Sequence, residues 1–367
     1  MAVIETTALG DSDVTTTRTL LHEAIPLTGT IVSGTYGVHP NEENIKNYNH
    51  GMFQSVFDYP YLSSSANHIF DITACYAASS SLSAASSVQN AKKINMYTEF
   101  AQTLLGFKSA SAESPASEVR LFESDLVLDN ISEMKEVFIV NFSRLLTKDQ
   151  IKKGSFSITI GTGAYASPFT EGLTASHGIV LADTKASPDG TGTTSTLGGD
   201  MALLYNDSSK NQNKAEGVVF YQAGVAVVSS SIFMTGANNV TRSFHYSSEV
   251  GDWQTATQAL TGASITGSCD SFRHRIYNIA FNNTTEINSK IYFCRIPHNT
   301  YNYSSNPTYL SASKIRVKDT ATDPPVSYIT TVGLYSSDNE LMATAKLSEP
   351  LRKDPTNDIT IRVRLDY

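Results

Sequence analysis

The sequence predicts a mainly β protein made of antiparallel β-sandwich domains, with one amphipathic helix near residues 87–106 and an extended N-terminal arm. Many short apolar segments alternate with polar residues at a period of two, which is typical of half-buried strands. Clusters of Gly, Pro and Asn separate these segments at regular intervals, as they do in β-sandwiches. A spacing of three and four residues, typical of a helix, is clear in one segment only. These observations together favour a β-rich fold with a single substantial helix.

The composition of the 367 residues limits the classes of partner. There are 27 Lys and Arg against 35 Asp and Glu, a net charge of −8, and charged residues make up 17% of the chain. An average soluble protein has roughly 25%, so the surface must be rich in Ser, Thr and Asn, which is typical of β-rich assembly proteins. The sequence has no runs of Lys or Arg. Nucleic acid is therefore not expected as a main partner, because neutralising phosphates takes clustered cations.

Contact with a membrane is not expected either. No stretch of the sequence approaches the ~18 uninterrupted apolar residues of a membrane span. The first residues carry an acid, Glu5, where a signal peptide has a basic and then an apolar segment.

Three regions are predicted along the chain. Residues 1–50 are expected to form an extended N-terminal arm, because Ile, Leu and Val alternate there with Thr, Ser and Gly in isolated strand-like pieces. Residues 51–300 are expected to form a β-rich central domain. Residues 301–367 are expected to supply strands that complete a β-sandwich, and ending in a strand ties the terminus into a sheet.

The helix near residues 87–106 is the clearest local prediction. Its apolar residues, spaced by three and four, are Val88, Ala91, Ile94, Tyr97, Phe100, Ala101, Leu104 and Leu105. Ser87 is placed to cap the first turn, and Gly106 is placed to end the helix. Lys92 and Lys93 are expected to point away from the apolar face.

The rest of the central domain is predicted as strands and turns. Residues 161–215, rich in Gly, Ser, Thr and Asp, are interpreted as an insertion that carries small strands such as Met201–Tyr205. A structureless loop of that length is uncommon inside a compact domain. Further strands are expected at Ser271–Phe281 and Ile287–Ile296, and Asn282–Thr285 between them has the residue types of a turn.

The C-terminal segment predicts a hairpin and a closing strand. Strand-like segments at Ser327–Tyr335 and Leu341–Leu347 flank a polar turn. The final strand, Ile359–Leu365, alternates apolar residues with Thr and Arg, which is typical of a strand with one buried face. Arg362 and Arg364 are therefore expected on one face, where they could meet the acids of a neighbour.

No catalytic constellation or metal-ligand cluster is recognisable in the sequence, so no cofactor, metal or catalytic residue is predicted. Cys75, Cys269 and Cys294 lie far apart with no CxxC pair, and buried free thiols are favoured over a disulfide between Cys269 and Cys294. The G-x-S-x-G motif of a nucleophilic serine is missing. The nearest His–carboxylate pair is His68 and Asp71, which would face opposite sides of a strand but lie as neighbours on a helix.

Two segments are candidate interfaces. Arg273 and Arg275 are predicted on the same face of one strand, either solvated or in contact with acids of another subunit, because Arg is favoured at interfaces. The loop that holds Tyr301, Tyr303 and Tyr309 combines rigid aromatic rings with small polar residues. This loop is expected to pack on its own domain or on an adjacent subunit, or to bind a glycan by stacking.

A set of strand-and-turn segments is distinctive as a group. Its members are Tyr328–Tyr335, Asn339–Ser348, Pro350–Lys353 and Ile361–Tyr367, together with Asn44–Tyr48, Tyr59–His68, Phe142–Leu146 and Ile151–Phe156. Taken together they resemble virion structural proteins of large tailed bacteriophages, of the T4 type and of related marine phages. The resemblance touches about half of the chain and includes no catalytic signature, so no functional residue is carried over from it.

The resemblance implies a non-enzymatic part of the particle, of neck, tail or baseplate type, with capsid decoration as a further alternative. It implies a location in the virion, assembled in the host bacterial cytoplasm, and partners that are other virion proteins and copies of the chain itself. Two other functions remain open. One is a glycan-binding adhesin or receptor-binding module that contacts a host surface glycan. The other is an enzyme, such as a hydrolase that uses a pair of acidic residues, although such pairs are set by the fold rather than by spacing.

Overall fold

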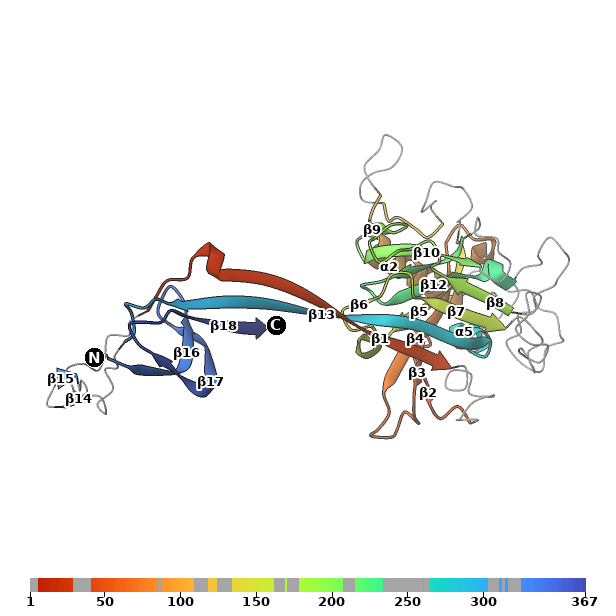
Figure 1. The fold of residues 1–367 in the computed structure, drawn as a ribbon. Helices are drawn as coiled ribbons and strands as arrows, with labels where there is room; N and C mark the ends of the chain where they lie inside the picture. The colour runs from red at the N-terminus through yellow and green to blue at the C-terminus, as the bar shows by residue number, and fades with distance from the viewer. Residues whose placement is uncertain are drawn as a thin grey trace. The chain divides into compact units, whose positions relative to one another are not determined.

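The computed structural model describes most of the chain (Figure 1). The described residues are 6–28, 41–84, 87–108, 118–123, 134–161, 169, 178–206, 215–233, 260, 264–302, 310–311, 314–315 and 325–367.

The chain divides into two compact units. The terminal unit consists of residues 1–20 and 286–367, and the central unit consists of residues 21–285. These bounds differ from the predicted ones at residues 50 and 300. The difference arises because two long strands, β1 (Val14–Thr28) and β13 (Ile276–Ile296), are hydrogen-bonded to each other and each has residues in both units.

Strands dominate the described residues, and the predicted mainly β, antiparallel fold is confirmed. The remaining strands are β2 (Ile45–Asn47), β3 (Gln54–Phe57), β4 (His68–Tyr76), β5 (Glu136–Phe142), β6 (Gln150–Ile151), β7 (Ser157–Gly161), β8 (Gly178–Ala182), β9 (Thr194–Thr196), β10 (Gly199–Asn206), β11 (Ala215–Phe220), β12 (Val225–Ser229), β14 (Leu310–Ser311), β15 (Lys314–Ile315), β16 (Ser327–Tyr335), β17 (Leu341–Lys353) and β18 (Ile359–Asp366). The helices are α2 (Val88–Leu105), α3 (Arg144–Thr147) and α5 (Ile265–Arg273), with 3₁₀ turns η1 (Asp11–Asp13), η2 (Ser81–Ala84) and η3 (Ser230–Phe233).

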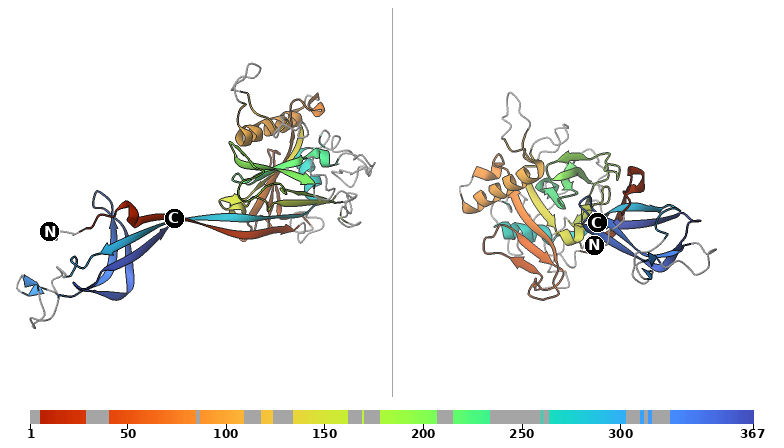
Figure 2. Two further views of the ribbon diagram at one scale, coloured as in Figure 1. Left: turned by 45° about the horizontal axis from the view of Figure 1, so that its top comes forward. Right: turned by 90° about the vertical axis from the view of Figure 1, so that its left-hand side faces the viewer.

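The central unit is built on one sheet with a hydrophobic cluster on each face. Across this sheet the strands follow the order β13-β7-β8-β10-β11-β12-β5-β4-β3-β2. Successive side chains of a strand point to opposite faces. Along β5, Val137 and Ile139 accordingly join one cluster, to which α2 contributes, whereas Phe138 and Val140 join the other, to which α5 contributes. The two helices therefore cover opposite faces of the sheet, and Figure 2 shows α2 (orange) lying along one of them.

Helix α2 confirms the helix prediction and corrects one part of it. The side chain of Ser87 accepts a hydrogen bond from the backbone N–H of Asn90, and Gly106 ends the helix with φ of 76°. Lys93 does not point to solvent, because it is fully buried and its Nζ donates to the carbonyl of Leu260. Its ammonium also lies 5.8 Å from the centre of the Tyr76 ring. Burial lowers the pKa of Lys93 to about 8.

The segment around residues 265–296 differs from its prediction. The predicted strand Ser271–Phe281 begins as helix α5, and the predicted turn Asn282–Thr285 lies inside the continuous strand β13. Asn283 and Thr284 are buried there, because their polar groups have partners on other elements. The amide of Asn283 donates to the carbonyl of Leu146 (2.9 Å) and accepts from the backbone N–H of Glu23 (3.1 Å). Such hydrogen bonds to distant segments replace the local ones that a turn would have supplied.

The predicted C-terminal hairpin and closing strand are both present in the terminal unit. Strand β18 pairs with the second half of β13, from Asp366 opposite Ser289 to Ile359 opposite Ile296. Strands β16 and β17 form an antiparallel hairpin (Figures 1 and 2). Strand β17 extends past the predicted end at Leu347 to Lys353, with an irregularity in register opposite the segment between Ile329 and Thr331.

Hydrogen bonds fasten the open end of this hairpin to the segment that follows β13. Ser327 donates to the carbonyl of Tyr301. Lys353 is fully buried, and its Nζ donates to the side-chain oxygen of Asn302 (2.7 Å) and to the carbonyl of His298 (3.1 Å). Among the described residues, polar contacts thus hold the base of the hairpin.

The other local predictions are largely confirmed. The predicted strand Met201–Tyr205 lies within β10. The interpretation of residues 161–215 as an insertion is wrong for the part that the structure describes, because β8 and β10 lie inside the central sheet between β7 and β11. The three cysteines are free thiols, with Cys75 and Cys269 buried and Cys294 half-buried, so the disulfide alternative for Cys269 and Cys294 is wrong. Cys269 donates instead to the carbonyl of Ile72 at 3.4 Å.

Candidate functional site

Arg273 and Arg275 do not lie on a solvent or interface face, as the sequence had suggested. Arg273 is the last residue of α5, Arg275 directly precedes β13, and both are fully buried. Their prediction was wrong because it assumed a single strand through residues 271–281. The helical turn at residues 271–273 directs the Arg273 side chain into the protein.

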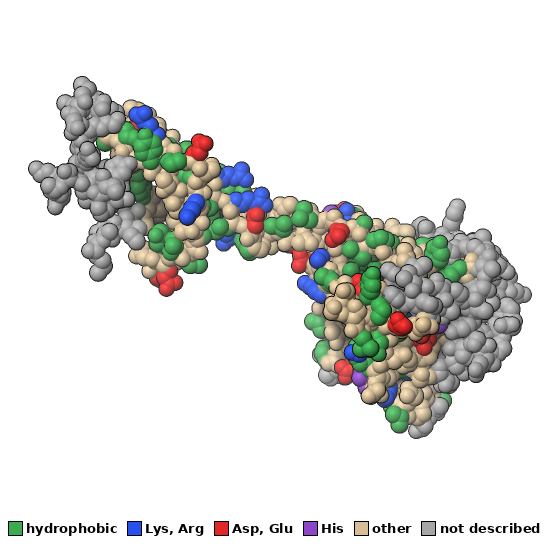
Figure 3. All heavy atoms as spheres, turned by 90° about the horizontal axis from the view of Figure 1, so that it is seen from below, with side chains coloured by type: hydrophobic (Ala, Val, Ile, Leu, Met, Phe, Trp, Pro, Cys, Tyr) green, Lys and Arg blue, Asp and Glu red, His purple; other side chains and the backbone are tan. Residues whose placement is uncertain are grey.

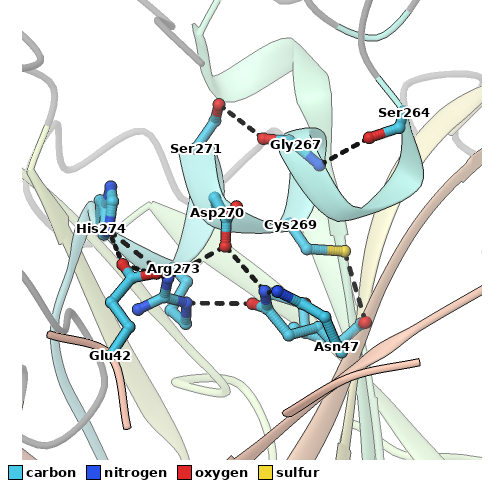
Figure 4. Close-up of polar contacts among 11 residues, drawn as sticks. Glu42, Asn47, Ser264, Gly267, Cys269, Asp270, Ser271, Arg273 and His274 are labelled. Atoms are coloured by element: carbon cyan, nitrogen blue, oxygen red, sulfur yellow. Dashed lines mark hydrogen bonds and ion pairs between the residues drawn. The ribbon is translucent and has the colours of Figure 1, made fainter. Parts of the chain in front are cut away.

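Arg273 is the centre of a buried polar network (Figure 4). Its Nη2 donates to Oε1 of Glu42 (2.8 Å) and to Oδ1 of Asp270 (3.0 Å), and its Nε donates to the side-chain oxygen of Gln54 (3.0 Å). The Nε2 of Gln54 in turn donates to Asp270 and to Asn47, each at 2.7 Å. The network joins α5 to β2, β3 and the residues before β2. Because the guanidinium is held on several sides by the protein itself, we interpret it as a structural element rather than a ligand-binding site.

Glu42 is shared by Arg273 and by His274, whose Nε2 lies 2.9 Å from the same carboxylate oxygen. The hydrogen bond from His274 is the largest cause that lowers the pKa of Glu42, and the charge of Arg273 acts in the same direction. Burial opposes these effects, and the net result is a pKa of about 2 against an ordinary value of 4.5. Glu42 has φ of 56°, a left-handed backbone conformation that residues other than Gly rarely adopt.

The lowered pKa predicts a loss of stability in acid. A group whose folded pKa lies below its unfolded one stabilises the fold above the unfolded value and loses that contribution as the pH falls through the folded value. We therefore expect the stability that Glu42 provides to be complete above about pH 4.5 and to decline towards pH 2. Melting temperatures of the wild type and of Glu42→Gln, measured from pH 6 to about pH 2.5, should converge as the pH falls. A difference that is independent of pH would contradict the prediction.

The His68–Asp71 pair is in contact, contrary to the expectation for two strand residues three apart. Nε2 of His68 lies 2.9 Å from Oδ1 of Asp71. In the pairing of β3 with β4, Val56 and Phe57 are opposite Phe70 and His68, so β4 carries an extra residue that restores both side chains to one face. Ser55 also donates to Asp71. A nucleophilic triad needs the serine on the imidazole and the acid on its other nitrogen, and this arrangement differs because both side chains bind the acid.

Asp183 is the most enclosed carboxylate in the described part of the central unit. It accepts hydrogen bonds from the hydroxyl of Tyr221 (2.7 Å) and from the backbone N–H groups of Gly154 (2.8 Å) and Phe156 (3.0 Å). Burial is the main cause that raises its pKa, and these hydrogen bonds oppose the rise. Its lone pairs are used to join neighbouring segments, so the arrangement is that of a structural acid. Over the residues that the structure describes, no three His, Cys, Asp or Glu side chains form a group that could hold a metal ion.

The predicted interface tyrosines are described only in part. The hydroxyl of Tyr301 lies 2.9 Å from the hydroxyl of Thr7, so this tyrosine contacts the N-terminal segment of its own unit. Tyr303 and Tyr309 lie outside the described residues, and the glycan-stacking role of their loop stays a prediction.

Arg362 and Arg364 lie where the alternation of β18 places them. Both are exposed, whereas Ile361 and Val363 between and before them are buried. Nε of Arg364 makes an ion pair with Oδ1 of Asp366 at 2.7 Å on the same face. Their predicted exposure is confirmed, and their contact with a neighbour stays a prediction.

A group of exposed apolar residues on the β16–β17 hairpin was not identified from the sequence. Tyr328, Tyr335, Leu341 and Met342 are all exposed. Figure 3 shows apolar side chains (green) that reach the surface of the terminal unit between separate acidic and basic ones. The signal was present in the strand Ser327–Tyr335, which has apolar residues at both odd and even positions, so one face of it cannot be wholly polar.

Neither the helices nor the comparisons with known proteins assign a function to the chain. No helix among the described residues is long and apolar enough to cross a membrane. The chain matches no family model, no curated protein and no solved structure.

Proposed function

We propose that this protein is a non-enzymatic structural subunit of a tailed-bacteriophage particle, of neck, tail or baseplate type, that is held in place by contacts between β-strand surfaces. The resemblance of its strand-and-turn segments to virion structural proteins supports the proposal. The polar network around Arg273 also supports it, because its ionisable side chains, which could otherwise serve in catalysis, make structural contacts with one another.

The observation that carries the proposal is how little apolar packing is found among the described residues of the terminal unit. Both hydrophobic clusters of the described chain consist of residues from the central unit. In the terminal unit the buried apolar residues are Ile291, Ile361 and Val363, as far as the structure describes it. A two-stranded hairpin is marginally stable in water without a further layer. A unit that exposes Tyr, Leu and Met on such a hairpin is suited to being covered by another protein.

Quantitative mass spectrometry of purified virions tests this function. The amount of this chain is compared with those of the major capsid and tail-tube proteins in particles of the phage that encodes it. We expect a fixed copy number, in small multiples of three or six for a neck or baseplate component. Hundreds of copies would indicate a tail or capsid-decoration protein instead. Absence of the chain from the particle would overturn the proposal.

Exposed aromatic residues after β3 favour one second candidate, a glycan-binding adhesin. Tyr59 and Tyr61 are exposed, and Nζ of Lys46 lies 6.0 Å from the centre of the Tyr61 ring. Aromatic rings of this kind can stack on sugar faces and have polar tips for hydrogen bonds. A glycan array compares the wild type with the variant Tyr59→Ala/Tyr61→Ala. Binding that this variant abolishes would support the adhesin, and an array without binding would remove it.

A further inference from the structure

The outer face of the β16–β17 hairpin is defined by its register. Directly opposed residues in an antiparallel pair share a face. Gly333 is opposite Thr344 and Thr331 is opposite Lys346, and these four side-chain positions are exposed. Val332 is opposite Ala345 and Leu334 is opposite Ala343, and these four are half-buried. The hairpin thus has an inner face, which is partly covered, and an outer face, which is open.

An apolar patch lies at the turn end of the outer face. Tyr335 is 38% exposed, Leu341 is 53% exposed and Met342 is 70% exposed. A Cβ atom added to Gly333 would lie 3.0 Å from Cε2 of Tyr335 and 3.3 Å from Cδ1 of Leu341. The ring and the leucine therefore lean over the glycine on the same face, and they form a continuous surface with the backbone beneath it.

The charges on this hairpin are separated along its length. Asp338 and Glu340 lie at the turn, next to the apolar patch, and both are exposed. Lys346 and Arg352 are exposed further along β17, where Glu349 is the one acid among residues 341–352. Six residues separate Glu340 from Lys346, which corresponds to about 20 Å along a strand. A second hairpin laid antiparallel on the first would bring acids next to bases at both ends.

The net charges of the two units favour the same partner. The terminal unit has 11 Lys and Arg against 12 Asp and Glu, a net charge of −1, so the central unit carries −7 of the total of −8. Copies of the chain repel one another through their central units. This repulsion is nearly absent between terminal units, where both signs are available for complementary contacts.

We propose that two copies of this chain associate through the outer faces of their β16–β17 hairpins, about a two-fold axis. Tyr335, Leu341 and Met342 of each copy form the apolar centre, and Glu340 of each copy faces Lys346 of the other. An interface of this kind is self-complementary, because the same patch serves on both sides. The inference rests on the proposed function, since it names the partner that covers the terminal unit.

The apolar centre is tested with the full-length protein by sedimentation equilibrium over about 1–100 μM, a span that brackets a micromolar dissociation constant. The wild type is expected to form dimers or larger assemblies with an even number of copies. The variant Leu341→Glu/Met342→Glu should raise the dissociation constant at least ~30-fold, because it places charge in the apolar centre. Leu62→Glu is the matched control, because Leu62 is 86% exposed in the central unit, and it should leave the dissociation constant within about twofold.

The charge pattern is tested by swapping the charges at positions 340 and 346. Glu340→Lys and Lys346→Glu should each weaken association ~5-fold, because each places like charges opposite one another across the interface. The double variant Glu340→Lys/Lys346→Glu should restore it, since opposite charges face each other again. The two residues lie too far apart in one chain to form this pair within a copy.

Each outcome has a defined meaning. Any of three results would overturn the proposed interface. They are a wild type that is monomeric at 100 μM, the highest concentration used, an assembly with an odd number of copies, and association that the apolar double variant leaves unchanged. Failure of the double exchange to restore association would overturn the two-fold arrangement. If the chain is monomeric in solution but present in virions at fixed copy number, the interface fails and the proposed function stands. If it associates as described but is absent from virions, the proposed function fails.

Discussion

Replacing Phe138 by alanine is expected to lower the free energy of unfolding of the central unit by about 3–5 kcal/mol. Phe138 is fully buried on β5, and its ring stacks on that of Phe272 of α5, with centroids 4.6 Å apart and planes at 5°. The ring of Phe233 meets it edge-on at 6.3 Å. Truncation removes apolar area and leaves a cavity between the sheet and α5, which rigid neighbours fill only in part.

Denaturant titration followed by far-ultraviolet circular dichroism measures this effect for Phe138. Phe107 is the matched control, because it is half-exposed at the end of α2. Phe107→Ala should change the free energy of unfolding by less than ~1 kcal/mol. A Phe138→Ala variant as stable as the Phe107→Ala variant would show that the ring is not part of a tightly packed core.

Replacing Arg273 by alanine is expected to cost about 3 kcal/mol of the stability of the central unit. The substitution deletes the donor that joins Glu42, Asp270 and Gln54, and it leaves two carboxylates near each other without their shared cation. It also opens a cavity where a fully buried side chain had been. Arg273→Lys should recover only part of the loss, because an ammonium cannot reproduce the planar fork of the guanidinium.

Thermal and denaturant unfolding of these Arg273 variants can be compared with those of Arg144→Ala. Arg144 is exposed, and its ion pair with Asp149 has an N–O distance of 3.9 Å. Its removal should change the free energy of unfolding by less than ~0.5 kcal/mol. Equal effects at positions 273 and 144 would contradict the interpretation of the Arg273 network as a structural centre.

Local sequence patterns were sufficient to predict those elements whose own residues favour the structure that they adopt. Helix α2 could be predicted because its apolar spacing agrees with a serine cap and a glycine stop. The strand Ile359–Leu365 could be predicted because one of its faces is apolar, and the β16–β17 hairpin because a polar turn separates two apolar runs. In these segments local preference and tertiary structure agree.

The segment of residues 265–296 could not be predicted because distant residues determine its structure. Helix α5, with the sequence ITGSCDSFR, is poor in strong helix formers and is held by a Ser264 cap and by the burial of Ile265, Cys269 and Phe272. In β13 the contacts of Asn283 come from segments more than 130 residues away. Propensity gives no information on such partners.

The candidate surface could be predicted only in part, for a related reason. Arg362 and Arg364 follow from the alternation of a single strand. The patch of Tyr335, Leu341 and Met342 depends on which face of a hairpin is covered, and that depends on the other strands of the unit. Arg273 was assigned to a surface because charge is usually exposed, whereas its acidic and amide partners come from segments before residue 55 and from its own helix.

The terminal unit is formed by two segments that are far apart in the sequence, and this has a consequence for synthesis on the ribosome. Arg18 and its ion-pair partner Glu286 are separated by 268 positions. At ~5–20 residues per second, roughly 15–50 s pass between their translation. During this time β1 has no strand to pair with, although the strands from β2 to β12 have already been translated. The β16–β17 hairpin is translated later still, so nascent chains that have not yet reached Lys353 cannot join through the proposed interface.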